Sequence, residues 1–121
     1  MTIRIYEYSG CSTCRKALQY LDGRKKKYEK LPIVEQPPTV AELKTMLAHF
    51  EAGGKTFKSL FNTSGEQYRA LKIGDRIKAG MTEHEAIALL SKNGKLIKRP
   101  FLLTDKGGAT GFKADEWDAL V

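Results

Sequence analysis

The sequence predicts an α/β fold, in which a mixed β-sheet core carries a helical subdomain inserted near the middle of the chain. Residues 2–8 are rich in β-formers and alternate loosely, and a helical apolar period begins directly after them. Residues 39–95 are dominated by helical patterns, and a hairpin and a short helix follow. We therefore expect one domain over residues 1–121, with the helical insertion at about residues 39–95.

The first helix is expected over residues 13–22, where apolar residues recur at the positions i, i+3, i+4 and i+7. Its stripe consists of Cys14, Ala17, Leu18 and Leu21. A second strand is expected around residues 28–34, and Pro32 within it indicates an edge or irregular position.

The insertion begins with a capping box at Thr39–Glu42, which predicts a helix that Gly53-Gly54 ends. Its expected apolar face is Val40, Leu43, Met46, Leu47 and Phe50. Residues 56–80 read as short helical pieces with the buried candidates Phe57, Leu60, Phe61, Tyr68, Leu71 and Ile73. A second capping box at Thr82–Glu85 opens a helix that ends at Asn93-Gly94.

The last part of the chain predicts a hairpin, with strands at residues 101–104 and 109–112 and a turn at residues 105–108. A short helix at residues 114–120 follows, with Trp117 as a core anchor.

The composition is that of an ordinary soluble protein, with 41% hydrophobic and 29% charged residues and a formal net charge of +7. The charge favours anionic partners, although for most of these lysines a solvated basic surface is the preferred explanation. Residues 24–27 form a basic run without interleaved aromatics, so direct binding of nucleic acid has little support. No stretch resembles a membrane span or a signal peptide, so we expect a cytoplasmic protein.

The chain has two cysteines, Cys11 and Cys14, and they stand three positions apart between the first strand and the first helix. Such a CxxC motif is where thioredoxin-like proteins carry redox chemistry, because a helix N-terminus favours the thiolate. The helical register places Cys14 on the buried stripe and Cys11 at the exposed tip, so Cys11 should attack and Cys14 should resolve. The alternatives are a structural pair or half of a zinc site. A zinc site would need His49 and His84 from separate helices, so we expect no metal.

The second candidate feature is Arg99-Pro100, directly before the strand at residues 101–104. Thioredoxin-like folds carry a cis-proline at this place, facing the redox cysteine. Arg99 could lower the pKa of Cys11 and bind an oxyanion or carboxylate, although a solvated arginine beside a structural proline is the alternative. Ser12, Thr13, Pro100 and Lys113 complete the candidate substrate-binding residues, and for Lys113 a solvated side chain is again the alternative.

The chain resembles the arsenate reductase family, ArsC, and within it most closely the Spx-like branch. The resemblance lies in four segments, Tyr8 to Ala17, Ser59 to Gly65, Leu96 to Pro100 and Gly111 to Glu116. It implies a thioredoxin-like core with a helical subdomain. In the glutathione- and glutaredoxin-linked arsenate reductases of the family, one cysteine attacks arsenate and three arginines bind the oxyanion. Cys11 and Arg99 match that pattern, whereas the other two arginine positions fall near Asn62 and Lys113.

The family's arsenate reductases typically lack a second cysteine, whereas the Spx branch uses a CxxC as a redox switch and binds the RNA polymerase α subunit. Gly54 corresponds in this resemblance to a glycine at that contact. The sequence therefore predicts a small thiol-disulfide oxidoreductase of the ArsC-like reductase family, with a redox-sensing transcriptional regulator as the alternative. No bound cofactor is expected, and the candidate external reductants are glutathione, glutaredoxin and thioredoxin. A redox-inactive member of the family is the third possibility.

Overall fold

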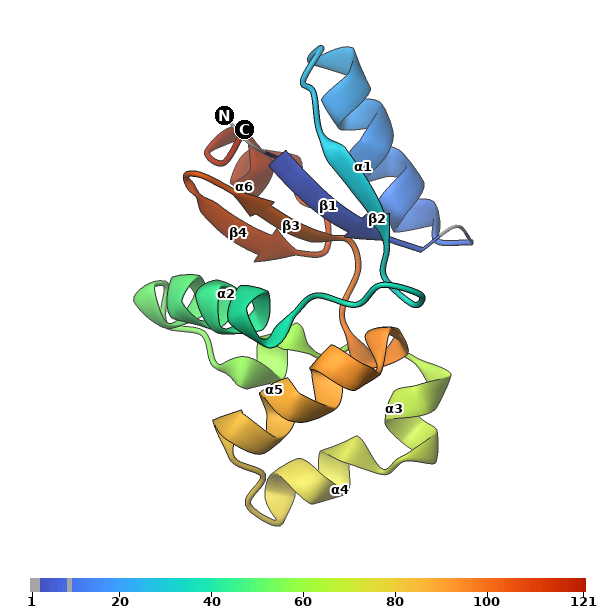
Figure 1. The fold of residues 1–121 in the computed structure, drawn as a ribbon, viewed down its shortest axis with the longest axis vertical. Coiled ribbons are helices and arrows are strands. Elements are labelled where there is room, and N and C mark those ends of the chain that lie inside the picture. The colour runs from blue at the N-terminus through green and yellow to red at the C-terminus, as the bar shows by residue number, and fades with distance from the viewer. Residues whose placement is uncertain (1–2, 9) are drawn as a thin grey trace.

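The computed structural model describes residues 3–8 and 10–121, and its centre is a four-stranded mixed sheet (Figure 1). The strands are β1 (Ile3–Glu7), β2 (Glu29–Pro32), β3 (Phe101–Thr104) and β4 (Gly107–Thr110), in the order β2-β1-β3-β4. Strand β1 pairs parallel with β2 and antiparallel with β3, and β3 pairs antiparallel with β4. The predicted mixed sheet and the edge position of the second strand are confirmed. Residue 2 of the expected first strand and Ser9 of the cysteine motif lie outside the described residues.

Helices cover both faces of this sheet (Figure 1). Helices α1 (Ser12–Gly23) and α6 (Ala114–Asp118) pack on one face, where Ile5, Leu102 and Trp117 belong to one apolar cluster. Helix α2 (Val40–Ala52) packs on the other face, where Tyr6 and Phe101 belong to a second cluster. The alternation along β1 divides its side chains between these two cores, as the period of a strand requires.

The helical half continues beyond α2, away from the sheet (Figure 1). It contains η1 (Phe57–Leu60), α3 (Glu66–Ala70), α4 (Ile73–Lys78), α5 (Glu83–Lys92) and η2 (Gly94–Leu96). The capping box at Thr39 and Glu42 is present in full, and the Thr82 side chain accepts a hydrogen bond from the backbone N–H of Glu85. Two burial predictions are wrong: Val40 is 43% exposed and Leu71 is 39% exposed. Both stand at helix ends, where fewer neighbouring elements are available to cover an apolar side chain.

The C-terminal hairpin differs from the expectation, because β4 begins at Gly107 rather than at Ala109. Thr104 pairs with Gly107, which leaves a two-residue turn at Asp105 and Lys106. The two glycines serve packing rather than the turn. A Cβ at Gly108 would stand 2.7 Å from the sulfur of Met46, so glycine lets helix α2 lie close against β4.

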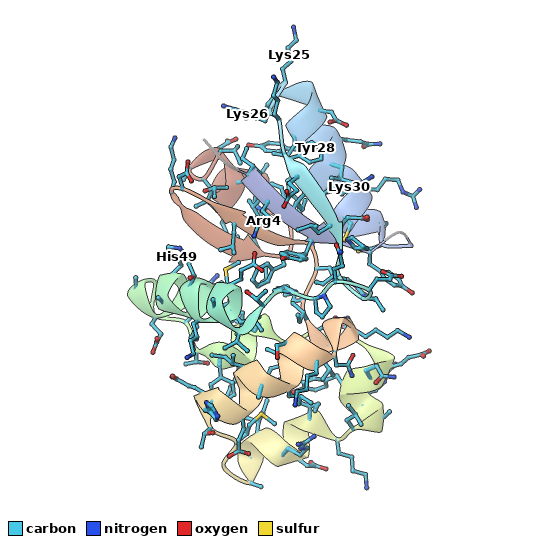
Figure 2. All side chains as sticks on the ribbon, viewed as in Figure 1. Arg4, Lys25, Lys26, Tyr28, Lys30 and His49 are labelled. Atoms are coloured by element: carbon cyan, nitrogen blue, oxygen red, sulfur yellow. The ribbon has the colours of Figure 1, made fainter. Side chains whose placement is uncertain are left out.

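Basic side chains surround the edge strand β2. Lys25 and Lys26 extend from the turn between α1 and β2, and Lys30 lies on the strand itself (Figure 2). Lysine and proline are residues that keep an exposed sheet edge from pairing with another chain. The basic run at residues 24–27 is thus exposed to solvent, in agreement with the interpretation of the basic residues as a solvated surface. In the described part of the chain, no helix has the length and apolar character needed to cross a membrane.

Candidate active site: a thiol pair at the start of helix α1

Cys11 is the N-cap residue of helix α1. Its backbone is extended (φ −94°, ψ 116°), and its Sγ accepts a hydrogen bond from the backbone N–H of Cys14 at 3.4 Å. The Cys11 N–H donates to the carbonyl oxygen of Tyr8 at 3.1 Å, which fixes the tight turn between β1 and the helix. The positive end of the helix dipole and a backbone N–H donor therefore both favour a negative charge on Cys11 Sγ.

Cys14 lies in the first turn of α1 and is only 1% exposed, whereas Cys11 is partly exposed and both thiols are free. The predicted helical register of the two cysteines is confirmed. Burial raises the pKa of Cys14 to about 12, and the neighbouring Cys11 adds to the rise by its hydrogen bond and its charge. As long as both cysteines are reduced, Cys14 is therefore a protonated thiol at neutral pH.

The opposite shift applies to Cys11. Burial alone would raise the pKa of its thiol, but several interactions favour the thiolate and together lower the pKa from its ordinary value. These are hydrogen bonds from the thiol and the backbone N–H of Cys14, the positive charge of Arg99, and the backbone N–H of Thr13. The two thiols therefore differ in their tendency to ionise, and Cys11 forms the thiolate more readily than Cys14.

Arg99 lies near the two cysteines in the fold, although it is far from them in the sequence. The Arg99–Pro100 peptide bond is cis, as the resemblance to thioredoxin-like folds implied, and Pro100 is buried directly before β3. The Arg99 guanidinium carbon lies 4.3 Å from the centroid of the Tyr8 ring, within the range of a cation–π contact. Within the described residues, Arg99 has no salt bridge and no side-chain hydrogen bond.

A hollow of about 320 Å³ opens beside Arg99 and Tyr8. Its other walls come from the segment after η1 and from η2, and its lining consists of Tyr8, Asn62, Gly65, Glu66, Gln67, Lys95 and Arg99. The two segments are joined by a bridge between Phe61 and Ile97 and by a 2.7 Å hydrogen bond from the Asn62 N–H to the Leu96 carbonyl. The hollow therefore shares Tyr8 and Arg99 with the thiol pair.

The remaining predicted site residues differ in how they are placed relative to the two cysteines and the hollow. Thr13 is half-buried and directs its N–H at Cys11, while Ser12 is exposed as the first residue of α1. Lys113 is exposed at the N-cap of α6, and it is absent from the lining of the hollow beside Arg99. Reasoning from the sequence missed Tyr8 as the stacking partner of Arg99, and it missed Glu66, Gln67 and Lys95 altogether. None of these four stands in a spacing that marks a site.

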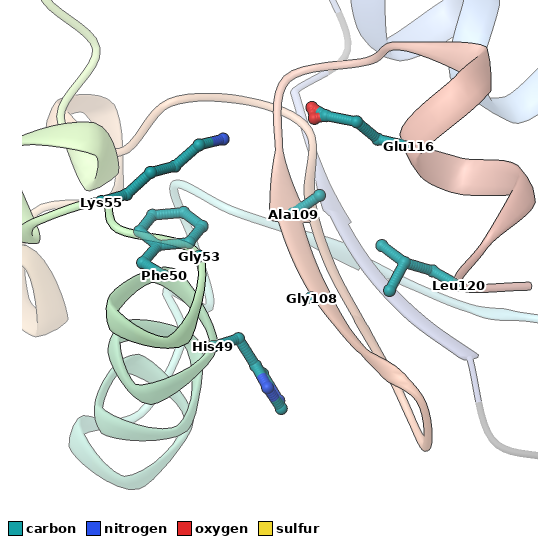
Figure 3. Close-up of a pocket in the computed structure, with 8 residues that line it drawn as sticks. All are labelled: His49, Phe50, Gly53, Lys55, Gly108, Ala109, Glu116 and Leu120. Atoms are coloured by element: carbon teal, nitrogen blue, oxygen red, sulfur yellow. The ribbon is translucent and has the colours of Figure 1, made fainter.

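A second hollow, of about 250 Å³, lies between α2, β4 and α6 (Figure 3). Phe50 and Leu120 contribute apolar walls, and His49, Lys55 and Glu116 contribute polar groups. Its lining has no cysteine, so the pair of Cys11 and Cys14 remains the candidate site for redox chemistry. In the described ranges, no three His, Cys, Asp or Glu side chains gather as metal ligands, and His49 and His84 are both exposed.

Comparison with known families places this geometry in context. The model of the ArsC family matches residues 6–120, which include the thiol pair, the cis-proline and most of both apolar cores. The chain belongs to the ArsC family. Its mixed sheet and covering helices are the thioredoxin-like arrangement that the resemblance implied.

Two curated relatives show the range within the family. The uncharacterized protein YusI of Bacillus subtilis is 38% identical over 118 residues, which cover 98% of this chain and 97% of YusI. The global transcriptional regulator Spx of Streptococcus mutans is 27% identical, over 98% of this chain and 82% of Spx. This ArsC chain is thus similar both to a protein without a described role and to a regulator.

Solved structures agree on the fold. A structure of an ArsC family related protein from Bacteroides fragilis has a TM-score of 0.88 and 42% identity, and covers 98% of this chain and 96% of the other. A structure described as a possible arsenate reductase from Streptococcus mutans has a TM-score of 0.82 and 34% identity, with 96% and 97% covered.

Proposed function

We propose that this ArsC-family protein is a thiol-disulfide oxidoreductase, in which Cys11 is the nucleophile, Cys14 the resolving thiol and Arg99 the group that binds substrate. The observation that carries the proposal is the asymmetry of the two thiols. The pKa of Cys11 is lowered at the helix start, and the pKa of Cys14 is raised to about 12 by burial one helical turn away. A pair with no redox role has no need for such a difference.

The reaction follows from this asymmetry. The Cys11 thiolate attacks one sulfur of a substrate disulfide, so that a mixed disulfide forms and the first substrate thiolate leaves. The negative charge on Cys11 then disappears, and with it the hydrogen bond and the repulsion that help to keep Cys14 protonated. Cys14 loses its proton to solvent and attacks Cys11 Sγ, which releases the second substrate thiolate. Two electrons have passed to the substrate, and an external thiol reduces the resulting Cys11–Cys14 disulfide.

A disulfide fits the site better than arsenate does. In the arsenate reductases to which the chain is similar, three arginines bind the oxyanion, and here Asn62 and exposed Lys113 stand near two of those positions. Arg99 alone offers a bidentate fork to an oxyanion. The second cysteine also supplies an internal resolving thiol, which a CxxC reductase uses to release the reduced substrate from the mixed disulfide.

The test is the rate at which iodoacetamide alkylates Cys11, measured against pH and read by mass spectrometry. We expect the reduced protein to react with a midpoint below that of an ordinary thiol, and Arg99→Ala to move the midpoint upward because a nearby positive charge is lost. Arg76→Ala removes the same charge from helix α4 and serves as the matched control. A wild-type midpoint in the ordinary thiol range would overturn the proposal.

Turnover gives the second readout. Disulfide reduction is followed with glutathione, glutaredoxin or thioredoxin as the reductant in separate assays, and no bound cofactor is added. Cys11→Ser should abolish the reaction, while Cys14→Ser should stop at the mixed disulfide, which a mass increase on Cys11 reveals. Full activity of Cys11→Ser in all three assays contradicts the assignment of the nucleophile.

The second candidate is a redox-sensing regulator that binds the RNA polymerase α subunit. Its support is the similarity to Spx and the exposed turn after α2, where Gly54 has φ +82° and open space around its Cβ position. A pull-down with the C-terminal domain of the polymerase α subunit tests it, using the dithiol and disulfide forms and a Gly54→Arg variant. Binding that depends on the redox form and is lost in the variant supports regulation, and no binding in either form excludes it.

A further inference from the structure

The side chain of Tyr8 adds little to the core of the protein. Tyr8 is 37% exposed and belongs to neither of the two apolar clusters. Within the described residues its hydroxyl has no hydrogen-bonded partner, and the charged group that lies over its ring is the Arg99 guanidinium, whose carbon is 4.3 Å from the ring centroid. Packing of the core therefore does not explain why an aromatic residue stands at this position.

The backbone of Tyr8, by contrast, is tied to both cysteines. Its carbonyl oxygen accepts a hydrogen bond from the Cys11 N–H at 3.1 Å. Its own N–H acts on Cys14 as a hydrogen-bond donor and lowers the pKa of that thiol, although burial outweighs this effect. A Cβ at Gly10 would stand 3.5 Å from the Tyr8 ring, so the ring lies against the turn between β1 and α1. The ring therefore has a fixed place at the start of the helix that carries the two thiols.

A second pair of arginine and tyrosine, at the other end of helix α1, is held in a different way. The Arg24 guanidinium carbon lies 4.7 Å from the Tyr20 ring centroid, and Arg24 also forms a salt bridge with Asp118 at 2.6 Å. Tyr20 packs against the apolar cluster that contains Trp117, and its hydroxyl donates to Asp118. Arg24 would thus keep a partner without its ring, whereas Arg99 has no carboxylate partner among the described residues.

An aromatic ring suits a cation near a thiolate better than a carboxylate does. A carboxylate would also hold the arginine, but its negative charge would offset the positive charge and disfavour the thiolate of Cys11. The face of an aromatic ring attracts a cation through its quadrupole and carries no net charge. With a ring as its partner, Arg99 therefore keeps its full positive charge available to Cys11 and to a substrate.

We propose that Tyr8 is a positioning residue, whose ring keeps the Arg99 guanidinium at the start of helix α1 without neutralising its charge. Tyr8 acts through Arg99 and takes no part in making or breaking bonds. The inference rests on the proposed function, since that function assigns the binding of substrate to Arg99. It adds the group that orders this long and flexible side chain before a substrate arrives, so that less conformational entropy is lost on binding.

The first test is a double-mutant cycle on the rate at which iodoacetamide alkylates Cys11, measured at a pH below the wild-type midpoint. Without the ring, Arg99 spends less time near the thiolate, so we expect Tyr8→Leu to lower the rate about two- to fivefold, the effect of one exposed cation–π contact. In the Arg99→Ala background the same substitution should leave the rate unchanged. Tyr8→Phe keeps the ring and should react like the wild type. Tyr20→Leu removes the ring of the other pair and is the matched control.

The proton chemical shifts of the Arg99 side chain give a readout that does not depend on Cys11. Protons above an aromatic ring are shielded, so the Arg99 δ protons, assigned by their loss in Arg99→Ala, should resonate upfield in the wild type and in Tyr8→Phe and return to the ordinary position in Tyr8→Leu.

The outcomes separate this inference from the proposed function. Unchanged Arg99 shifts in Tyr8→Leu, an unchanged alkylation rate, or an equal fall of that rate with and without Arg99 each overturn the inference and leave the reductase function in place. An effect of Tyr8→Leu that requires Arg99, together with no turnover in any of the reductase assays, would instead end the proposed function and support the assignment of Tyr8.

Discussion

Two polar clusters flank strand β1, and they differ in whether their charges are paired. The carboxylate cluster, made of Arg4, Tyr6, Thr39 and Glu42, lies on the face covered by α2. Glu42 accepts hydrogen bonds from Arg4 at 2.8 Å, from the Tyr6 hydroxyl at 2.7 Å and from the Thr39 N–H at 3.0 Å. Each of its carboxylate oxygens is therefore occupied by the fold itself.

The thiol corner, made of Tyr8, Cys11, Cys14 and Arg99, follows directly after β1. Its arginine lies over the Tyr8 ring and lowers the pKa of Cys11 through its charge, but no carboxylate among the described residues pairs with it. The first cluster uses its charges to join α2 to the sheet, and the second leaves a charge open to a ligand. The comparison shows that the fold pairs Arg4 with carboxylates, whereas Arg99, to which we assign the binding of substrate, has no such partner among the described residues. Substitutions should accordingly affect stability in one cluster and reactivity in the other.

The largest expected effect is that of Glu42→Ala. This change leaves the Tyr6 hydroxyl and one side of the Arg4 guanidinium without a partner and also removes the capping box of α2. We expect a loss of about 2 kcal/mol in the free energy of unfolding, measured with urea. Glu51→Ala, at an exposed position of the same helix, is the control and should change it by less than about 0.5 kcal/mol. An equal loss in both variants would remove the distinction between the clusters.

Acid should weaken the same cluster to a smaller extent. Burial alone would raise the pKa of Glu42, but Arg4, the Thr39 N–H and Tyr6 outweigh it and lower the pKa from its ordinary value. A carboxyl with a lowered pKa stabilises the folded protein above its unfolded pKa of about 4.3, and this contribution is lost as the pH falls through the folded pKa. Urea unfolding between pH 7 and pH 3 should show a steeper loss for the wild type than for Glu42→Gln. Parallel curves for the two proteins would contradict this.

Tyr6→Phe should have a smaller effect again, because it removes one hydroxyl and keeps the aromatic packing against Phe101. Glu42 retains Arg4 and Thr39 as partners, so we expect a loss of about 1 kcal/mol by urea unfolding. Tyr28→Phe removes a hydroxyl that donates to exposed Asp22 and provides the matched comparison. A larger loss for Tyr28→Phe than for Tyr6→Phe would show that Tyr6 adds nothing beyond an ordinary surface bond.

The smallest effect on stability is expected for Arg99→Ala, at less than about 0.5 kcal/mol, since this arginine has no hydrogen-bonded partner among the residues that the structure describes. Its consequence should appear instead as a higher pKa of Cys11 in the alkylation assay. Urea unfolding of the reduced protein checks the first point. A loss as large as that of Glu42→Ala would make Arg99 a structural residue and would break the comparison.

Local pattern was enough to predict most of the elements and the positions of the two cysteines on helix α1. Helical spacing alone assigned Cys14 to the buried side of α1 and Cys11 to its start, because the period of a helix depends only on nearby residues. The capping box at Thr39 and the edge position of β2 follow from equally local chemistry. Local pattern failed for Gly107 and Gly108, which were predicted to form a turn but lie in β4, where Leu120 packs against Gly107 and Met46 of α2 packs against Gly108.

Gly94 is a similar case. The sequence marks it as the end of a helix, yet a Cβ there would stand 1.8 Å from the carbonyl oxygen of Ile33, so it also lets η2 approach the segment after β2. No spacing in the sequence indicates that contact, since the two residues are far apart in the chain.

The sequence by itself determined the family and the different positions of the two thiols, with Cys11 at the helix start and Cys14 on the buried side, because these depend on neighbours within a turn or two. Only the tertiary structure decided what surrounds that thiol. Glu66 comes from one segment, Lys95 and Arg99 come from another, and they meet Tyr8 because the sheet order and the Phe61–Ile97 bridge bring these parts of the chain together. Whether a charge is paired or open depends on such long-range contacts, and for this reason the substrate-binding side of the site appears only in the folded chain.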